Sequence, residues 1–262
     1  MTAALITGAS GGIGEAFARR LASDRHDLVL VARSEDKLRE LCAELSAAHG
    51  IKANYIAADL GEPDSDAKIF DETTRLGLDV GLLINNAGFG SMGDFVDLDR
   101  ERELAMINLN VRALVALTHR YLPPMREKRK GTIINVSSAA GEQPLPFMAT
   151  YAATKAFVTS FSMAIAEENR PFGIQVFALC PGPTRTNFFE AGNIDKSLML
   201  KGEQTVEDVV ETAVATIGTG RSKVISGLMN RITAAAAGLA PDSLVTRVVA
   251  SQLRKKFQKI PE

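Results

Sequence analysis

Short apolar runs alternate with longer helix-patterned segments along this sequence, and that alternation limits the folds open to it more than any other feature. The runs predict strands at residues 3–7, 27–31, 52–57, 80–84, 132–136, 174–178 and 223–226. The segments between them predict helices at residues 14–23, 34–49, 64–76, 100–121, 152–169 and 206–217. Such alternation is typical of βαβ units, which build a mostly parallel sheet with helices on both faces. Because βαβ crossovers are right-handed, we expect an α/β fold with a Rossmann-like, doubly wound sheet of about seven strands.

The domain organisation follows from what is missing between these elements. No internal repeat, low-complexity tract or long linker interrupts the 262 residues, which suffice for one full-sized core. We therefore predict a single domain over residues 1–262. Within it we expect a cofactor-binding and catalytic core at 1–186 and a substrate lid with the C-terminal region at 187–262.

Two late segments depart from the alternating pattern. Residues 183–202 hold two adjacent phenylalanines and no clear strand, and they follow the sixth predicted strand at the edge where such sheets bind ligands. A lid over a substrate is the expectation there, with an irregular connector as the alternative. From Pro241 onward, an apolar stripe predicts a helix that packs on the core or on another subunit, although a membrane-surface helix also fits. The stripe consists of Leu244, Val248, Val249, Leu253 and Phe257.

Composition excludes several classes of function. The net charge of −1 provides no basic field for nucleic acid, and two cysteines with three scattered histidines give no metal-ligand spacing. No apolar run reaches the roughly 18–20 residues of a membrane span. The sequence enters a predicted strand at once, which leaves no room for a secretory signal, so the expected compartment is the cytoplasm.

A glycine-rich turn lies directly between the first predicted strand and the first predicted helix. Its spacing is G-x-x-x-G-x-G, from Gly8 to Gly14. Glycines let a backbone turn tightly and approach a diphosphate, whose charge the helix N-terminus stabilises. The turn therefore predicts a dinucleotide cofactor, contacted by Gly8, Ser10, Gly11, Gly12, Ile13 and Gly14.

The end of the second predicted strand bears on the choice of cofactor. A carboxylate at that position would bind the ribose hydroxyls of NAD, whereas an arginine accommodates the additional phosphate of NADP. Arg33 stands there, and no acidic residue follows until Glu35. NADP(H) is thus the preferred cofactor, with NAD as a possibility.

Tyr151 and Lys155 are four residues apart on a predicted helix and so share one of its faces. Neither side chain titrates near pH 7 by itself, but a neighbouring positive charge lowers the pKa of a phenol. This makes Tyr151 a candidate general acid–base. Two solvated surface residues would show the same spacing.

Taken together, these motifs resemble those of the short-chain dehydrogenase/reductase family, and the resemblance covers most of the chain. TGxxxGxG corresponds to Thr7 through Gly14, NNAG to Asn85 through Gly88, and YxxxK to Tyr151 and Lys155. The resemblance further implies a catalytic Asn110, with Asn108 as the less favoured alternative, and a catalytic Ser138. It adds cofactor contacts by Asp59, Leu60, Asn86, Ala87, Gly88, Tyr151, Lys155, Pro181, Gly182, Thr184 and Thr186.

The resemblance implies an oxidoreductase that transfers hydride between the nicotinamide and a carbonyl or secondary alcohol. Tyr151 would exchange the proton, Lys155 would lower its pKa, Ser138 would bond the oxyanion and Asn110 would hold a water. Homodimers or homotetramers are implied through the helices at 100–121 and 152–169. Apolar residues suggest a hydrophobic ketone or aldehyde, and the candidate substrate contacts are Gln143, Phe147, Phe188 and Phe189. The alternatives are a non-catalytic NADP(H) sensor and a membrane-peripheral reductase of 3-ketoacyl lipids.

Overall fold

The computed structural model describes residues 2–186, 188, 203–239 and 241–257. Seven strands form one sheet in the order β3-β2-β1-β4-β5-β6-β7, and every neighbouring pair is parallel. The strands are β1 (Ala3–Thr7), β2 (Leu28–Ala32), β3 (Ala53–Ala57), β4 (Val80–Asn85), β5 (Gly131–Val136), β6 (Ile174–Cys180) and β7 (Lys223–Ile225). The predicted doubly wound α/β fold is confirmed.

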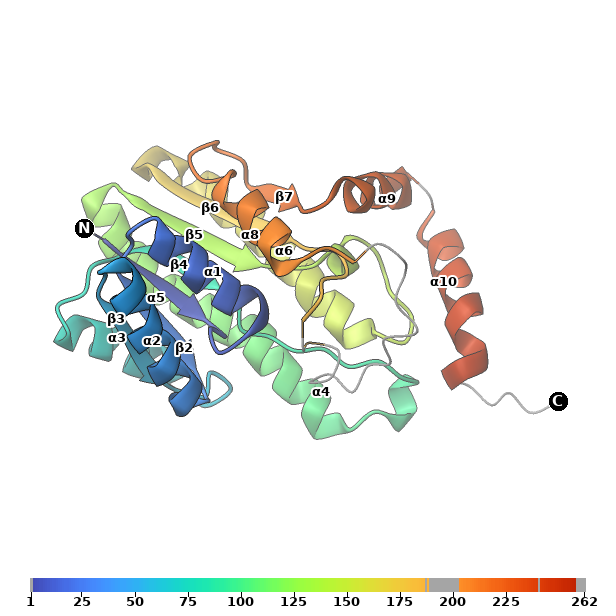
Figure 1. Cartoon of the computed structure of the whole chain (residues 1–262). Coiled ribbons are helices and arrows are strands. Elements are labelled where there is room, and N and C mark those ends of the chain that lie inside the picture. Colours follow the sequence, from blue (N-terminus) through green and yellow to red (C-terminus); the bar gives the residue numbers. More distant parts are fainter. Residues whose placement is uncertain (1, 187, 189–202, 240, 258–262) are drawn as a thin grey trace.

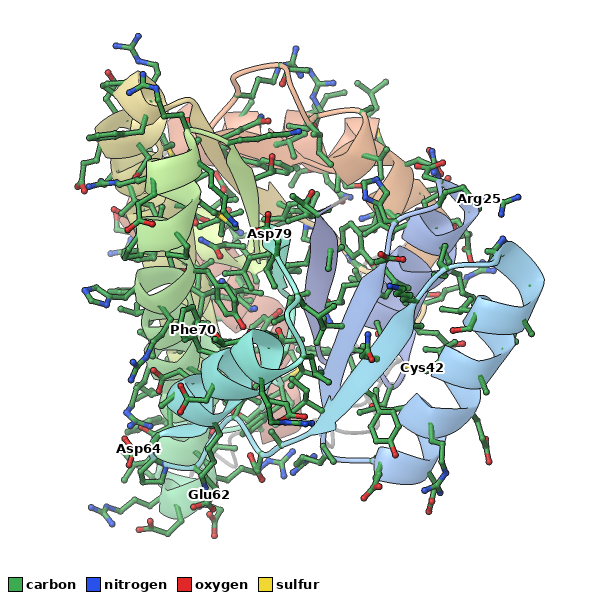
Figure 2. All side chains as sticks on the ribbon, turned by 90° about the vertical axis from the view of Figure 1, so that its left-hand side faces the viewer. Arg25, Cys42, Glu62, Asp64, Phe70 and Asp79 are labelled. Atoms are coloured by element: carbon green, nitrogen blue, oxygen red, sulfur yellow. The ribbon has the colours of Figure 1, made fainter. Side chains whose placement is uncertain are left out.

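Helices cover both faces of this sheet (Figure 1). The main helices are α1 (Gly12–Ser23), α2 (Glu35–His49), α3 (Ser65–Arg75), α4 (Arg100–Ile107), α5 (Leu114–Lys128), α6 (Ala149–Asn169), α8 (Val206–Val214), α9 (Leu228–Leu239) and α10 (Asp242–Phe257). Alternate strand residues point to opposite faces and build two apolar cores. One core joins the sheet to α1, α2 and α8, and the other joins it to α3, α5 and α6. Figure 2 shows Cys42 of α2 and Phe70 of α3 on opposite sides of the sheet.

The helix predicted at 100–121 differs from the observed one in two ways. It runs on to Lys128 through Pro123 and Pro124, although proline removes a helical hydrogen bond. Tertiary contacts hold this last part, because Met125 is buried and the Arg126 guanidinium bonds Asn169. A π-helical segment, η2 (Asn108–Ala113), also separates α4 from α5. Such segments are uncommon and are frequent at functional sites.

The apolar stripe predicted after Pro241 is divided between two faces of α10. Leu253 is buried and Phe257 and Val249 are partly buried, whereas Leu244 and Val248 are about half exposed. The spacing of these residues spreads them over more of the helix than one seam covers, because each residue advances by about 100°. The single stripe was therefore wrong, although the helix exists.

The ends of the segment predicted as a lid lie close together. The backbone N–H of Gln204 donates to the carbonyl of Pro183 at 3.0 Å, and the N–H of Arg185 donates to the carbonyl of Gln204 at 3.1 Å. These two bonds form a parallel bridge at Thr184. Most of the intervening residues, and with them the lid itself, lie outside the described part of the chain.

Candidate active site

The glycine turn brings α1 against the end of β1 as closely as a backbone allows. A Cβ on Gly14 would lie 2.3 Å from the carbonyl oxygen of Gly8, and Gly8 itself has a φ of 65°. Only glycine fits these positions without strain. No side chain caps the N-terminus of α1 at Gly11. The first backbone N–H groups of a helix have no partner inside it, so this end can bind a diphosphate.

Thr7 and Asn86 fasten this turn to the end of β4. The Thr7 hydroxyl accepts hydrogen bonds from the backbone N–H groups of Asn86 at 2.9 Å and Ala87 at 3.0 Å. In return, the Asn86 side-chain amide donates to the carbonyl of Thr7 at 2.9 Å. The two sequence motifs, almost eighty residues apart, are therefore hydrogen-bonded to each other at the carboxyl edge of the sheet.

Asn110 lies inside the π-helical segment and is buried. Its Oδ1 accepts from the backbone N–H of Phe89 at 3.1 Å, and its Nδ2 donates to the carbonyl of Phe89 at 2.9 Å and to the Thr154 hydroxyl at 3.2 Å. Asn108, the alternative, is exposed. Gly88 lies between Asn110 and Lys155, since a Cβ on it would be 2.8 Å from Asn110 Oδ1 and 3.5 Å from Lys155 Nζ.

Tyr151 and Lys155 are both buried on α6, with Lys155 Nζ 5.8 Å from the centre of the Tyr151 ring. The Lys155 ammonium donates to the carbonyl of Val136 at 2.9 Å. Ser138 follows β5 and accepts a hydrogen bond from the N–H of Ala140, and its side chain also bonds Tyr151. The structure thus brings Ser138, Tyr151, Lys155 and Asn110 together around one point.

Burial dominates the electrostatics of this group. It raises the pKa of Tyr151 to about 12, and the hydrogen bond with Ser138 opposes that rise. It lowers the pKa of Lys155 to about 8. The net shift of Tyr151 is therefore opposite to the lowering expected from Lys155, because removing the phenolate from water outweighs a cation at this distance.

The residues predicted to contact the adenosine part of the cofactor are more exposed. The Arg33 side chain, just beyond β2, is 80% exposed, and its NH1 lies 3.9 Å from Oδ2 of Asp59. Asp59 also accepts from the N–H of Gly61 at 2.8 Å. The Leu60 side chain packs in the core, so any cofactor contact there involves the backbone. The pair formed by Arg33 and Asp59 was not anticipated from the sequence.

The turn after β6 closes the other side of the site. Thr184 donates from its hydroxyl to the carbonyl of Gly182 at 2.8 Å, and a methyl carbon of Thr186 would lie 3.3 Å from a Cβ on Gly12. A Cβ on Gly182 would lie 2.1 Å from Nδ2 of Asn230 on α9. Asn230 therefore borders the site, and no pattern in the sequence marked it.

Apolar side chains cluster around the Tyr151 ring. Met106, Met148 and Tyr151 form the buried centre of this cluster, and Phe188 lies 5.3 Å from Tyr151 between ring centres. Phe147, which has a positive φ of 67°, stacks on Phe257 of α10 at 5.3 Å. Gln143 is partly buried, and Phe189 lies outside the described residues. Of the four candidate substrate contacts, Phe188 packs against Tyr151, and Phe147 packs against Phe257, which the sequence assigned only to a helix stripe.

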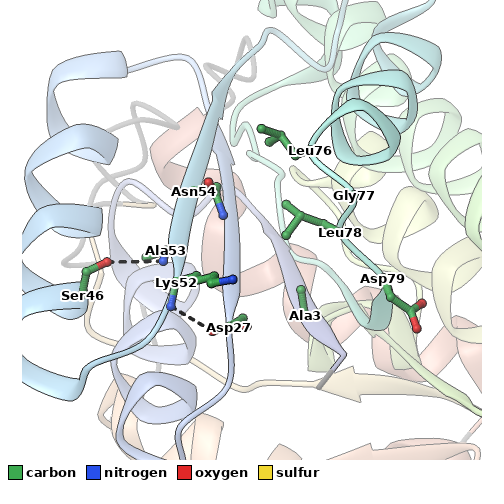
Figure 3. A pocket seen from close by; sticks show the side chains of 10 residues that line it. All are labelled: Ala3, Asp27, Ser46, Lys52, Ala53, Asn54, Leu76, Gly77, Leu78 and Asp79. Atoms are coloured by element: carbon green, nitrogen blue, oxygen red, sulfur yellow. Dashed lines mark hydrogen bonds between the residues drawn. The ribbon is translucent and has the colours of Figure 1, made fainter.

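A separate polar hollow of about 460 Å³ lies at the opposite, amino edge of the sheet (Figure 3). Asp27, Lys52 and Asp79 line it, next to the beginnings of β2, β3 and β4. It shares no residue with the group around Tyr151. Among the described residues, no three His, Cys, Asp or Glu side chains are grouped to hold a metal ion.

Comparison with known proteins agrees with this geometry. Residues 2–197 match the family described as short chain dehydrogenase. The chain is 32% identical to the very-long-chain 3-oxoacyl-CoA reductase of Anas platyrhynchos, over 98% of this chain and 82% of the relative. It is 34% identical to the 7beta-hydroxysteroid dehydrogenase of Mediterraneibacter gnavus, over 87% of this chain and 86% of the relative.

Solved structures give the same result. A short-chain dehydrogenase from Sphingobium yanoikuyae in complex with NADPH superposes with a TM-score of 0.82 and 33% identity, covering 100% of this chain and 98% of that one. The resemblance inferred from the motifs is confirmed.

Proposed function

This chain belongs to the short-chain dehydrogenase family, an enzyme family that acts on CH–OH and C=O groups, and on that premise we propose that it is an NADP(H)-dependent reductase of bulky apolar ketones or aldehydes. The observation that carries the proposal is the Ser138–Tyr151–Lys155 group, in which Tyr151 and Lys155 are buried and the Tyr151 ring belongs to an apolar cluster. The Ser138 hydroxyl, the Tyr151 phenol and the Lys155 ammonium lie together beside the two hydrogen-bonded, glycine-containing turns.

The described residues fit a nicotinamide dinucleotide. The Gly8–Gly14 contact leaves backbone N–H groups at the start of α1 for a diphosphate, and Gly88 leaves space beside Lys155 where a side chain would collide with Asn110. In this proposal Arg33 binds the 2′-phosphate, and Gly182 and Thr184 line the nicotinamide end. When bound, NADPH supplies the hydride.

The protein's own residues supply the proton and the positioning. Tyr151 holds its proton at neutral pH and donates it from Oη to the substrate oxygen. Ser138 donates a hydrogen bond to the same oxygen as charge develops there, an interaction typically worth about 2.7–4 kcal/mol. Lys155 stays mostly protonated at pH 7, because its pKa of about 8 lies above that pH, and its positive charge stabilises the phenolate left on Tyr151.

Asn110 positions the segments that carry the catalytic groups. Its side chain ties the backbone of Phe89, after β4, to the Thr154 hydroxyl of α6. Thr154 in turn donates to the carbonyl of Tyr151 at 2.7 Å. We assign to Asn110 the orientation of the helix turn that carries the phenol, in addition to a water-mediated path that returns the proton.

The substrate class rests on the surroundings of Tyr151. Apart from the Lys155 ammonium, the described neighbours that cluster with its ring include methionine, phenylalanine and leucine side chains. The names of two relatives refer to a very-long-chain 3-oxoacyl-CoA and to a 7beta-hydroxysteroid, whose acyl chain and steroid rings are large and apolar. A substrate with an apolar body therefore suits the apolar surroundings of Tyr151 better than a small sugar or keto acid.

We expect NADPH oxidation to increase with the apolar size of the carbonyl compound. Burying one more methylene contributes roughly 0.8 kcal/mol, so kcat/KM should rise by up to about fourfold per methylene until the binding site has no more apolar surface to cover. A screen of ketones and aldehydes graded by chain length and polarity measures this. Highest kcat/KM on short polar aldehydes would contradict the substrate class while leaving the reaction class intact.

Cofactor choice is tested by Arg33→Ala. Hydrogen bonds to charged groups contribute about 1.5–3 kcal/mol, so KM for NADPH should rise by roughly 10- to 150-fold while NADH kinetics stay unchanged. Arg75→Ala removes another exposed arginine, at the end of α3, and should change neither cofactor's KM. An equal loss with both cofactors, or a wild-type preference for NADH, would refute the assignment.

A further inference from the structure

The two C-terminal helices expose an unusual share of large apolar side chains. Leu228 and Met229 are each 69% exposed, and Ile232, Leu244 and Val248 are 50–54% exposed. The inward faces of both helices are occupied: Asn230 packs on Gly182, and Ala250 and Leu253 are buried. We refer to the solvent-exposed apolar side chains of the two helices as the α9–α10 face and define it by Leu228, Met229, Ile232, Leu244 and Val248.

Charge distinguishes this part of the chain from the rest. Residues 228–262 contain six Lys or Arg against two Asp or Glu, a net charge of +4, whereas the whole chain has −1. Arg231, Arg247 and Arg254 are exposed, and none of them forms an ion pair with another residue of the described part. At about 100° per residue, Arg247 and Arg254 lie about 60° and 80° around α10 from Leu244, next to the side that carries Leu244 and Val248.

Both helices that carry the α9–α10 face contact residues of the candidate site. Asn230 of α9 donates to the carbonyl of Ser226 at 2.8 Å and touches the Gly182 turn. Phe257, at the end of α10, stacks on Phe147. Figure 1 shows the two helices beyond the sheet, on the side of α4 and the carboxyl ends of the strands.

We propose that the α9–α10 face docks on the surface of an anionic phospholipid bilayer. Exposed apolar side chains insert at the boundary of headgroups and acyl chains, and neighbouring arginines bind anionic headgroups. A second copy paired by twofold symmetry would place the same face against itself, and thus bring two segments of charge +4 together. The charge therefore favours the lipid surface. Among the described residues, no helix has the length and apolar character needed to cross a membrane. This docking goes beyond the proposed reaction and does not depend on it.

Sedimentation of the full-length protein with vesicles tests the proposal. Wild type should bind phosphatidylcholine vesicles that contain phosphatidylserine, and bind pure phosphatidylcholine vesicles much more weakly. Arg247→Gln should weaken binding to the anionic vesicles about fivefold, as one surface charge does, and added salt should reduce this difference. The double variant Leu244→Glu/Val248→Glu should weaken it at least tenfold.

A matched control and an independent measurement complete the test. Ile217→Glu adds a charge at an exposed apolar residue that precedes β7, at the amino end of that strand, and should leave vesicle binding unchanged. Turnover of a short, water-soluble ketone should be the same in all variants, so loss of binding is separable from loss of the reaction. Equal binding to both vesicle types, or no effect of the double variant, would overturn the proposal. So would light scattering that shows the double variant dissociating a dimer while no protein sediments with vesicles.

Discussion

Tyr151→Phe is expected to reduce turnover by about 10²–10⁴-fold, the usual contribution of a positioned general acid, while NADPH binding stays intact. Phenylalanine keeps the ring that packs against Phe188 and Met148 and removes only the hydroxyl that bonds Ser138. Single-turnover oxidation of NADPH measures the chemical step, and fluorescence titration measures cofactor binding. Full turnover with NADPH bound would eliminate Tyr151 as the proton donor.

Tyr121 offers a closely matched control for this experiment. It is also fully buried, burial also raises its pKa to about 12, and its hydroxyl bonds Thr73 at 2.9 Å. Tyr121→Phe should cost about 1 kcal/mol of unfolding free energy through that lost bond and leave turnover unchanged. The contrast separates a chemical role of a buried phenol from a structural one.

Lys155→Met is expected to abolish most activity without destabilising the protein at pH 7. Burial lowers the pKa of Lys155 from 10.5 to about 8, so the folded protein holds a buried ammonium at neutral pH at a cost of roughly 3 kcal/mol. Methionine removes that cost and has a similar shape, but leaves the carbonyl of Val136 without its donor, which costs about 1–3 kcal/mol. The two effects nearly cancel, whereas the loss of the charge beside Tyr151 is uncompensated.

The difference in unfolding free energy between Lys155→Met and wild type should change with pH in one direction. Between about pH 8 and 10.5 the unfolded chain keeps the Lys155 proton and the folded chain does not, so the unfolding free energy of wild type rises with pH. Relative to wild type, Lys155→Met should therefore lose stability as pH rises through this window. Urea unfolding at pH 7 and pH 10 measures the difference, and Lys37→Met, at an exposed lysine of α2, should show no such trend. A loss of several kcal/mol at pH 7 would contradict the balance described here.

The parts of the site that the sequence predicted are those whose chemistry is local. Gly8 and Gly14 are required by close contacts within one turn of the backbone. Tyr151 and Lys155 are related by one turn of a helix, so both spacings can be recognised in the sequence. Parallel strands then bring their carboxyl ends to one edge, which explains why motifs almost eighty residues apart meet there. The strand order, by contrast, is not visible in the pattern of any single strand.

What the sequence did not predict depends on contacts between distant segments. The π-helical segment around Asn110 has no recognisable residue pattern. Asn230 of α9 contacts Gly182, and Phe257 of α10 contacts Phe147, because the fold brings these distant segments together. The direction of the Tyr151 pKa shift likewise depends on burial, which spacing alone does not reveal.

The bridge between Thr184 and Gln204 has a consequence for how such an enzyme can diversify. Because the two ends of the intervening segment are fastened to each other, its closure cost depends only weakly on length, by about 0.6 kcal/mol per doubling. Insertions, deletions or replacements between these ends need not disturb the sheet, and they spare the surroundings of Tyr151 when Phe188, which packs against its ring, is kept. The bridge thus allows the segment to be exchanged, in evolution or by protein engineering, so that selectivity can change while the rest of the fold stays the same.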